Sequence, residues 1–351
     1  MKQFIDLPDL SLARFEQQFD LSGIEKEEAE TEAISLNEET TIAVKVGDLF
    51  KLGEHRLLCG DCLKEENITL LMDGQLAQIL CTDPPYNLKT ADFQGKGSVK
   101  HEDFVMAAGE MSDEEFATFL KQVMQLACKH TIDGGLHYIF MDHRHSWHMG
   151  EAARKVYGSP EPKQTCVWKK DIPANGSFYR VQHEFCFIYK YGTAKHKSYL
   201  ELKDRSRANV WEYAGANSWG NPDRDREGHL SGLGELANHP TPKNSAMIAD
   251  IFLDVTDEGD IVLEMFSGSG TAIVAGERTK RKVYAIDLKP DFVQSTLIRY
   301  YKHCLKHDTP FDFEHVNGEI TESLIKEWYE ATLTPKEATT NQANAEESNT
   351  D

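Results

Sequence analysis

Two short stretches of this 351-residue chain carry residue types suited to chemistry on a bound ligand. The first is Asp83-Pro84-Pro85-Tyr86, which follows the apolar run Ala77 to Thr82. Two consecutive prolines fix the backbone and remove two amide donors, so this segment offers mainly carbonyl acceptors. With the Asp83 carboxylate they form an acceptor array for a substrate NH2 group, and Tyr86 offers a flat face on which a base can stack.

The chemistry that such an array supports is group transfer to nitrogen. An exocyclic amine is a poor nucleophile because its lone pair is delocalised into the ring. Two acceptors bonded to its hydrogens favour the pyramidal geometry that frees the lone pair. No metal and no covalent intermediate are required, although a proline turn of this kind also arises in proteins without any such activity.

The second stretch runs from Ile261 to Thr271, where a predicted strand enters a glycine-rich turn and then a helix of small residues. Such a turn lets backbone approach a ligand closely and directs helix N-terminal amides at it. A second predicted strand ends at Asp287, where an acid can accept hydrogen bonds from ribose hydroxyls. The pair indicates an adenosine-containing ligand, but it does not distinguish NAD from S-adenosylmethionine.

Both stretches resemble motifs of the amino-group DNA methyltransferases. Asp83-Pro84-Pro85-Tyr86 looks like their catalytic motif, and the segment 266–271 looks like their cofactor motif. The catalytic motif comes first, which is the order of the permuted β class. The resemblance covers roughly residues 45 to 305, and the segment 46–58 is similar to methylases of phages and mobile elements. It implies transfer of a methyl group from S-adenosylmethionine to the N6 nitrogen of a flipped adenine in duplex DNA.

The resemblance also assigns site residues. The catalytic residues would be Asp83, Pro84, Pro85 and Tyr86. The cofactor would be bound by Asp61, Thr82, Thr241, Lys243, Glu264, Phe266, Ser267, Gly268, Ser269, Gly270, Thr271 and Asp287, with Asp61 at the adenine and Thr241 and Lys243 at the methionine part. Four positions depart from the family pattern: Glu264 and Met265 replace the usual Asp and Pro, Asn244 replaces a proline, and Asp287 replaces a more common Glu.

The elements that must position these residues alternate along the chain. Apolar runs of strand length occupy His55 to Cys59, Ala77 to Thr82, Leu136 to Met141, Glu184 to Tyr189, Ile261 to Met265 and Lys282 to Ile286. Helices are predicted after a capping box at Ser112 and Glu115, with Asp133-Gly134-Gly135 as the stop, and over Asn244 to Asp254, Ser269 to Thr279 and Pro290 to His307. This alternation predicts an α/β, Rossmann-like doubly wound sheet, mostly parallel with an antiparallel strand and with helices on both faces.

The distribution of charge separates tails from body. The net charge is −20, which is unusual for a protein that binds phosphates. Residues 1–41 are predicted to be an acidic flexible segment, 42–330 the methyltransferase domain with a target-recognition insert at about 190–238, and 331–351 a disordered tail. Within the body, Lys163 to Arg207 holds ten basic and four acidic residues.

DNA contacts are expected from basic residues in that stretch, in the insert and after the catalytic motif: Lys89, Lys169, Lys170, Arg180, Arg205, Arg207, Arg224 and Arg226. The tyrosines Tyr179, Tyr189 and Tyr191 accompany them. A solvated strand face would explain the same charges, and for any one arginine a phosphate contact or no contact is as good an explanation as base recognition.

Composition indicates a cytoplasmic protein with no membrane partner. The seven cysteines are an odd number with no leader before them, and no apolar run reaches the roughly 20 residues of a membrane span. His143, His145 and His148 have the spacing of a helix surface, and Cys59 and Cys62 lack a second ligand pair, so no metal is expected. A homodimer and a cognate restriction endonuclease are partners that the resemblance leaves open.

Several alternatives also stay open. Cytosine-N4 methylation is the nearest, although that group more often has Ser at the position of Asp83. Methylation of RNA or of a protein glutamine, a DNA-binding relative with weak or absent catalysis, and an NAD dehydrogenase follow in that order.

Overall fold

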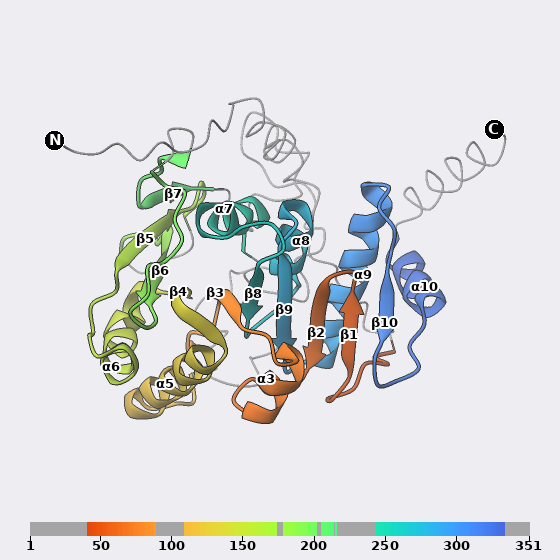
Figure 1. Ribbon diagram of the computed structural model, residues 1–351, viewed down its shortest axis with the longest axis horizontal. Helices are drawn as coiled ribbons and strands as arrows, with labels where there is room; N and C mark the ends of the chain where they lie inside the picture. Colours follow the sequence, from red (N-terminus) through yellow and green to blue (C-terminus); the bar gives the residue numbers. More distant parts are fainter. Residues whose placement is uncertain are drawn as a thin grey trace.

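The computed structural model of the protein describes residues 41–88, 109–173, 178–201, 205–213, 215 and 243–333. Within these ranges the chain forms a ten-stranded sheet with helices on both faces (Figure 1). This is the α/β architecture that the alternation of apolar runs predicted. No helix in the described ranges is both long and apolar enough to cross a membrane.

Five adjacent parallel strands form the centre of the sheet: β2 (His55–Cys59), β9 (Lys282–Asp287), β8 (Ile261–Glu264), β3 (Ala77–Thr82) and β4 (Thr131–Met141). Beyond β2 lie the antiparallel strands β1 (Leu49–Leu52) and β10 (Phe313–His315). Beyond β4 lie β6 (His183–Lys190), antiparallel to it, then β5 (Gln164–Lys169) and β7 (Val210–Glu212). Parallel strands place their carboxyl ends at one edge, so the loops that follow them share that edge.

The helices divide between the two faces of the sheet. One face packs against α7 (Ser245–Val255), α8 (Thr271–Thr279) and α9 (Pro290–Lys306), and α10 (Glu322–Thr332) packs against α9. The other face packs against α3 (Glu65–Met72), α5 (Asp113–Lys129) and α6 (Ser146–Tyr157), which follows the short 3-10 turn η2 (His143–His145).

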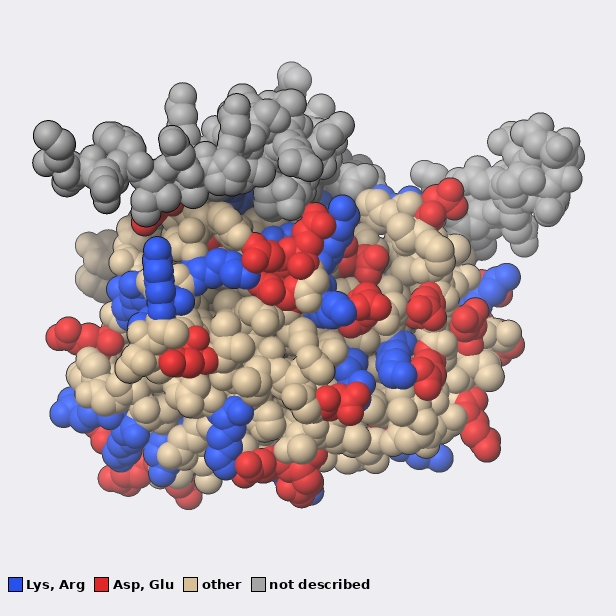
Figure 2. Space-filling model, in the orientation of Figure 1, with Lys and Arg blue, Asp and Glu red and all other residues tan. Residues whose placement is uncertain are grey.

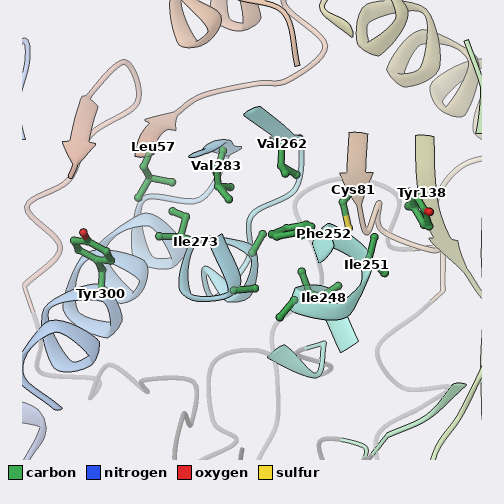
Figure 3. Close-up of a cluster of buried hydrophobic side chains, with 14 of the residues drawn as sticks. Leu57, Cys81, Tyr138, Ile248, Ile251, Phe252, Val262, Ile273, Val283 and Tyr300 are labelled. Carbon is green, nitrogen blue, oxygen red and sulfur yellow. The ribbon is translucent and has the colours of Figure 1, made fainter. Parts of the chain in front are cut away.

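The strands bury alternate residues in two separate cores. Val262 of β8 points to the α7–α9 face, and its neighbour Leu263 points to the other. Figure 3 shows the first core, in which strand side chains such as Val283 face Ile273 and Phe252 of the helices. Because both faces are covered, the central strands carry consecutive apolar residues, such as Val262 and Leu263 of β8, as is typical of parallel sheets.

The predicted elements match the structure with local differences. The capping box at Ser112 is confirmed, because its hydroxyl accepts from the Glu115 amide and the Glu115 carboxylate accepts from the Ser112 amide. The helix ends earlier than predicted, at Lys129, and β4 begins at Thr131. The sequence 133–135, predicted as a stop, forms an irregularity inside β4, where Gly134 has a φ of 91° and the pairing with β3 shifts register.

The remaining expectations about organisation concern segments at the ends and in the insert. Residues 1–40 and 334–351 lie outside the described residues, as does most of the predicted insert. Helix α10 continues to Thr332, two residues past the predicted end of the domain, because Ile325 and Trp328 pack into the core formed with α9.

Candidate active site

The two predicted motifs line one cavity of about 280 Å³ at the carboxyl edge of the central strands. Residues from both motifs contribute to its wall, together with residues that follow β2, β4 and β9: Gly60, Asp61, Thr82, Asp83, Pro84, Pro85, Tyr86, Asp142, His143, Lys170, Glu184, Lys243, Glu264, Phe266, Ser267, Gly268, Ser269, Thr271, Asp287 and Phe292. An arrangement with the two motifs on opposite faces would have excluded direct transfer between their ligands.

Strand pairing explains how motifs about 180 residues apart come together. Leu80 of β3 pairs with Leu263 of β8. Asp83, directly after β3, and Glu264, the last residue of β8, therefore lie at the same edge of the sheet. On the other side β9 pairs with β8, which brings Asp287 to the same edge. Strand β6 is antiparallel to β4, so Glu184 near its amino end also lies there.

The end of the cavity that is lined by Asp83 and Tyr86, the acceptor end, contains a cluster of charged side chains that are largely buried. The Tyr86 hydroxyl lies 2.7 Å from Asp83 Oδ1 and 3.0 Å from Glu184 Oε2, and its single proton can serve one carboxylate at a time. The Lys243 ammonium donates to Asp83 Oδ2 and lies 3.1 Å from Glu184 Oε2. Lys170 Nζ donates to the other Glu184 oxygen at 2.5 Å.

Burial and charge oppose one another in this cluster. Burial raises the pKa of Asp83, and the nearby Lys243 cation counteracts only part of that effect. Burial would also raise the pKa of Glu184, but Lys243 and Lys170 together lower it to about 2. Burial disfavours the Lys243 ammonium, yet the two carboxylates raise its pKa above the ordinary value. The cluster therefore holds two anions balanced by two cations.

Aromatic rings surround the Lys243 ammonium. Its nitrogen lies 5.4 Å from the ring centres of Tyr86 and Phe140 and 5.9 Å from that of Trp168. Such faces attract a cation and exclude water from it. Lys243 is predicted to hold the methionine part of a cofactor, and in the structure its ammonium contacts Asp83 and the ring of Tyr86.

The glycine-rich turn forms the floor of the opposite end. Gly268 and Gly270 have φ values of 51° and 78°, a region that L side chains rarely adopt. A Cβ on Gly270 would lie 2.5 Å from Thr296 Cγ2 of α9. The buried Arg299 guanidinium donates to the Ser269 carbonyl at 2.9 Å and to the Thr271 hydroxyl at 3.0 Å, which fixes the turn against α9.

Glu264 is a buried carboxyl group directed at this end of the cavity. It accepts from the Thr82 hydroxyl at 2.6 Å and from the Phe266 amide at 2.9 Å. Burial raises its pKa to about 8, and no Lys, Arg or His among the described residues forms an ion pair with it. A cation bound in the cavity would supply the missing charge. The longer side chain of Glu264 therefore still presents its oxygen to the site.

Asp61 and Asp287 lie at the end of the cavity formed by β2 and β9. Asp287 accepts from the Gly268 amide at 2.7 Å and from the Lys289 amide at 2.9 Å, and burial raises its pKa to about 6. The Asp61 carboxylate accepts from the Leu63 amide at 2.9 Å. Phe292, which the sequence did not single out, adds an aromatic wall beside them.

The residues predicted to contact DNA fall into different environments. Arg205 is 5% exposed and donates to Asp254 at 2.6 Å, and Arg207 donates to the same carboxylate at 2.8 Å. Both guanidinium groups attach the segment before β7 to α7 through this carboxylate. Lys89, Arg224, Arg226 and the predicted cofactor residue Thr241 lie outside the described residues.

The other three basic residues border the cavity side of the sheet. Lys169 pairs with Glu212 at 2.6 Å on the surface, and Lys170 faces the cavity. Arg180 donates to the Pro173 carbonyl in the connection between β5 and β6. The same connection carries Phe178 and Tyr179, which are 86% and 82% exposed and whose ring centres are 4.5 Å apart.

The sequence assigned no role to one residue of the cavity, Glu184. Glu184 is the first residue of the predicted strand Glu184 to Tyr189, and only the antiparallel pairing of β6 shows that it reaches Tyr86. An acid at the first position of an otherwise apolar strand was the available signal, since a charge is rarely buried there without a partner.

Comparison with known proteins agrees with this geometry. The solved structure of the PvuII DNA methyltransferase, titled cytosine-N4-specific, has a TM-score of 0.51 and 16% identity, covering 79% of this chain and 91% of that one. That likeness shows a shared open α/β methyltransferase fold. The type II methyltransferase M1.MboII of Moraxella bovis is 23% identical over 258 residues, or 68% of this chain and 92% of the relative.

A second relative matches over a shorter stretch. The type II methyltransferase M2.MboI of Moraxella bovis is 26% identical over 99 residues, so the match spans 28% of this chain and about a third (32%) of that protein. The model of the N6/N4 DNA methylase family matches residues 77–298, which is more than half of the chain. The protein therefore belongs to the N6/N4 family of DNA methylases.

Proposed function

We propose that the protein transfers a methyl group from S-adenosylmethionine to the N6 nitrogen of an adenine flipped out of duplex DNA. The observation that carries the proposal is the single cavity in which Asp83 and Tyr86 lie at one end and the glycine-rich turn at the other. Asp at the first motif position favours adenine over cytosine, since the cytosine-N4 group more often has Ser there.

The cofactor end fits S-adenosylmethionine by its chemistry. The Ser267 hydroxyl is buried and has no hydrogen-bond partner among the described atoms, and Glu264 has no basic partner there. A ligand that brings both an anionic acceptor and a cation would satisfy these groups. Asp287 and Asp61 would accept from the ribose and adenine, and Phe292 would cover the ring. When bound, the cofactor supplies an electrophilic methyl group on a sulfonium sulfur.

The acceptor end then acts on the base. Asp83 would accept a hydrogen bond from the amino group and, with a rigid carbonyl of the two prolines, hold it in a pyramidal geometry. Tyr86 would contact the flipped ring while its hydroxyl keeps the Asp83 carboxylate in place. After transfer the nitrogen carries one proton too many, and the Asp83 carboxylate is the nearest base to receive it on the way to solvent.

DNA would approach over the connection between β5 and β6. Lys169, now paired with Glu212, and Arg180, which donates to the Pro173 carbonyl, would contact phosphates. The exposed rings of Phe178 and Tyr179 would stack against bases. Lys89, Arg224 and Arg226 remain proposed contacts. Figure 2 shows Lys and Arg interspersed with Asp and Glu over the described part of the face drawn. Phosphate contacts on this face would therefore come from a few local basic residues, and the salt dependence of DNA binding would reflect those few contacts.

The experiment that tests this function is nucleoside analysis of DNA from cells that express the chain, compared with cells that express Asp83→Ala. The expected result is N6-methyladenine that depends on Asp83. N4-methylcytosine would move the assignment to the other base of the family, and no methylated nucleoside above background in DNA would overturn the proposal. Sequencing that detects methylation gives the recognition site from the same DNA.

A further inference from the structure

The acceptor that the proposed function requires is already occupied by donors of the protein itself. Asp83 Oδ1 accepts from Tyr86, and Asp83 Oδ2 accepts from the Lys243 ammonium. A carboxylate has further lone pairs, but an amino group that reaches Asp83 inside this crowded cluster competes with these two donors for the carboxylate. An ammonium on a flexible four-carbon side chain can move more easily than the ring of Tyr86, which the proline turn holds.

A second carboxylate lies where the displaced ammonium would need one. Lys243 Nζ is 3.1 Å from Glu184 Oε2 in the same arrangement in which it contacts Asp83. The side chains of Glu184 and Lys243 are 8% and 7% exposed, so neither exchanges its partner for bulk water. A small displacement of the ammonium toward Glu184 frees Asp83 without leaving a buried charge unpaired, which would otherwise cost several kcal/mol.

We propose that Lys243 and Glu184 are positioning residues of the methyl transfer. In the base-free enzyme Lys243 holds Asp83 ionised and in place, and when the target amino group enters, Lys243 shifts its contact from Asp83 to Glu184. Lys170 holds the other oxygen of Glu184 and keeps that side chain directed at Lys243. This inference rests on the proposed function, because it concerns the amino group that Asp83 is proposed to accept.

The charges around Asp83 support such an exchange. The groups that face it are Lys243 from the start of α7, Tyr86 from its own turn and Glu184 from β6, and Cys81, Cys186 and Glu264 lie close enough to interact electrostatically. Lys170 balances Glu184. Since the incoming amino group is neutral, the cluster keeps the same total charge before and after the shift.

The two residues act on Asp83 in opposite directions, which makes the inference testable. Lys243 lowers the pKa of Asp83 and Glu184 raises it, while burial raises it most. If transfer requires ionised Asp83, activity is lost as pH falls through the pKa of that carboxyl. Lys243→Met should move this acid limb to higher pH by about 1 to 3 pH units, the usual effect of an adjacent opposite charge. Glu184→Gln should move it to lower pH.

A second measurement needs no cofactor. The probe is a duplex that contains the recognition site with 2-aminopurine beside the target position, so that flipping of the target increases its fluorescence. Two versions carry adenine or unsubstituted purine at the target. Glu184→Gln leaves Lys243 with Asp83 as its only carboxylate, so it should weaken flipping of adenine about tenfold or more, the effect of one charged hydrogen bond. Flipping of purine, which has no amino group, should not change.

Controls separate this role from a structural one. Lys197 also lies between two carboxylates, Asp257 and Asp260, but on the surface away from the cavity. Lys197→Met should leave the acid limb and the flipping unchanged. If Lys243→Met does not fold, Glu184→Gln carries both measurements. If it folds, the variant with both substitutions should recover adenine flipping relative to Glu184→Gln alone.

The outcomes distinguish the two proposals. If the wild-type chain transfers no methyl group to DNA, the proposed function fails. If the wild type methylates DNA but Lys243→Met and Glu184→Gln lower the rate equally at every pH, or weaken adenine and purine flipping alike, the positioning role is overturned. Opposite movements of the acid limb together with the adenine-specific loss of flipping establish it.

Discussion

The two ends of the cavity satisfy their buried carboxyl groups in different ways. At the acceptor end Asp83 and Glu184 have cationic partners from the chain itself, Lys243 and Lys170. At the cofactor end Glu264 and Asp287 accept only from hydroxyl and amide groups, and burial raises the pKa values to about 8 and about 6. The acceptor end thus has cations of its own, whereas at the other end a bound cation would be the partner that an ionised Glu264 lacks among the described residues.

This difference predicts how each end responds to change. Loss of a residue at the acceptor end should affect the rate of transfer and its pH dependence. Loss of a carboxyl group at the cofactor end should affect the affinity for the cofactor. Changes outside the cavity should affect stability alone.

The largest effect is expected from Asp83→Ala. Removing the carboxylate leaves the amino group of the base with only the rigid carbonyl of the proline turn as acceptor, so the single-turnover rate should fall roughly 100-fold or more, as when a preorganised polar contact is removed from other active sites. Cofactor affinity, measured by calorimetry, should stay at the wild-type value because Asp83 does not belong to that end. Wild-type transfer rates in this variant would show that the acceptor end is not where the chemistry occurs.

The next effect concerns Glu264. Its pKa of about 8 means that the carboxyl is protonated at neutral pH in the free protein and must ionise to bind a cation. Cofactor affinity should therefore rise with pH up to about 8 and then level off. Glu264→Gln should weaken binding about tenfold or more, the effect of one charged hydrogen bond.

The ratio of wild-type to Glu264→Gln affinity is the informative quantity, because titration of the cofactor's own amine affects both proteins. That ratio should increase between pH 6 and pH 8, the interval below the pKa of about 8. A ratio independent of pH would show that Glu264 does not bind the cation.

A smaller effect is expected where the glycine-rich turn meets α9. Gly270→Ala places a Cβ against Thr296 in a backbone conformation that only glycine adopts freely. The free energy of unfolding should fall by about 1 to 3 kcal/mol, as is usual for strained backbone. The variant that also carries Thr296→Ala should regain part of this loss, and equal losses in the single and double variants would contradict the steric explanation. Chemical denaturation measures both.

The smallest effect lies outside the cavity, at the start of α5. Ser112→Ala removes the hydroxyl that caps the helix and accepts from Glu115. Stability should decrease by about 1 kcal/mol, the usual contribution of an N-cap. Methylation and cofactor affinity should be unchanged, and a change in either would link α5 to the site in a way that the contacts do not.

The sequence predicted the central sheet well because its strands are buried on both faces. The runs at Ala77–Thr82 and Ile261–Glu264 contain consecutive buried apolar residues, and each is followed by a turn with unusual residues. The outer strands β1, β10 and β7 escaped prediction because they are three or four residues long. Strand β5 also escaped, although it has six residues, because its buried positions alternate with partly exposed ones and it has no long apolar run. The glycines at 134 and 135 predicted a break but form an irregularity, because β3 and Tyr191 supply their backbone partners.

The site was predicted less completely than the fold. The sequence predicted that Asp83 and the glycine-rich turn lie at the same edge of the sheet, because each follows a predicted parallel strand and the carboxyl ends of parallel strands share one edge. The position of the Lys243 ammonium could not be predicted, since it depends on contacts with residues about 60 and 160 positions away and on three aromatic rings. Similarly, the sequence shows Arg205 and Arg207 only as part of a basic stretch, and their pairing with Asp254 of α7 could not be predicted from it.

The most direct test of the account is a structure of the protein with a duplex that contains its recognition site and with S-adenosylhomocysteine, the demethylated product of the cofactor. The account predicts a flipped adenine whose amino nitrogen lies within about 3 Å of the Asp83 carboxylate. It also predicts the sulfur on the glycine-rich turn facing that nitrogen, with the Lys243 ammonium on Glu184. A base outside the cavity, or a sulfur directed away from the amino nitrogen, would contradict it.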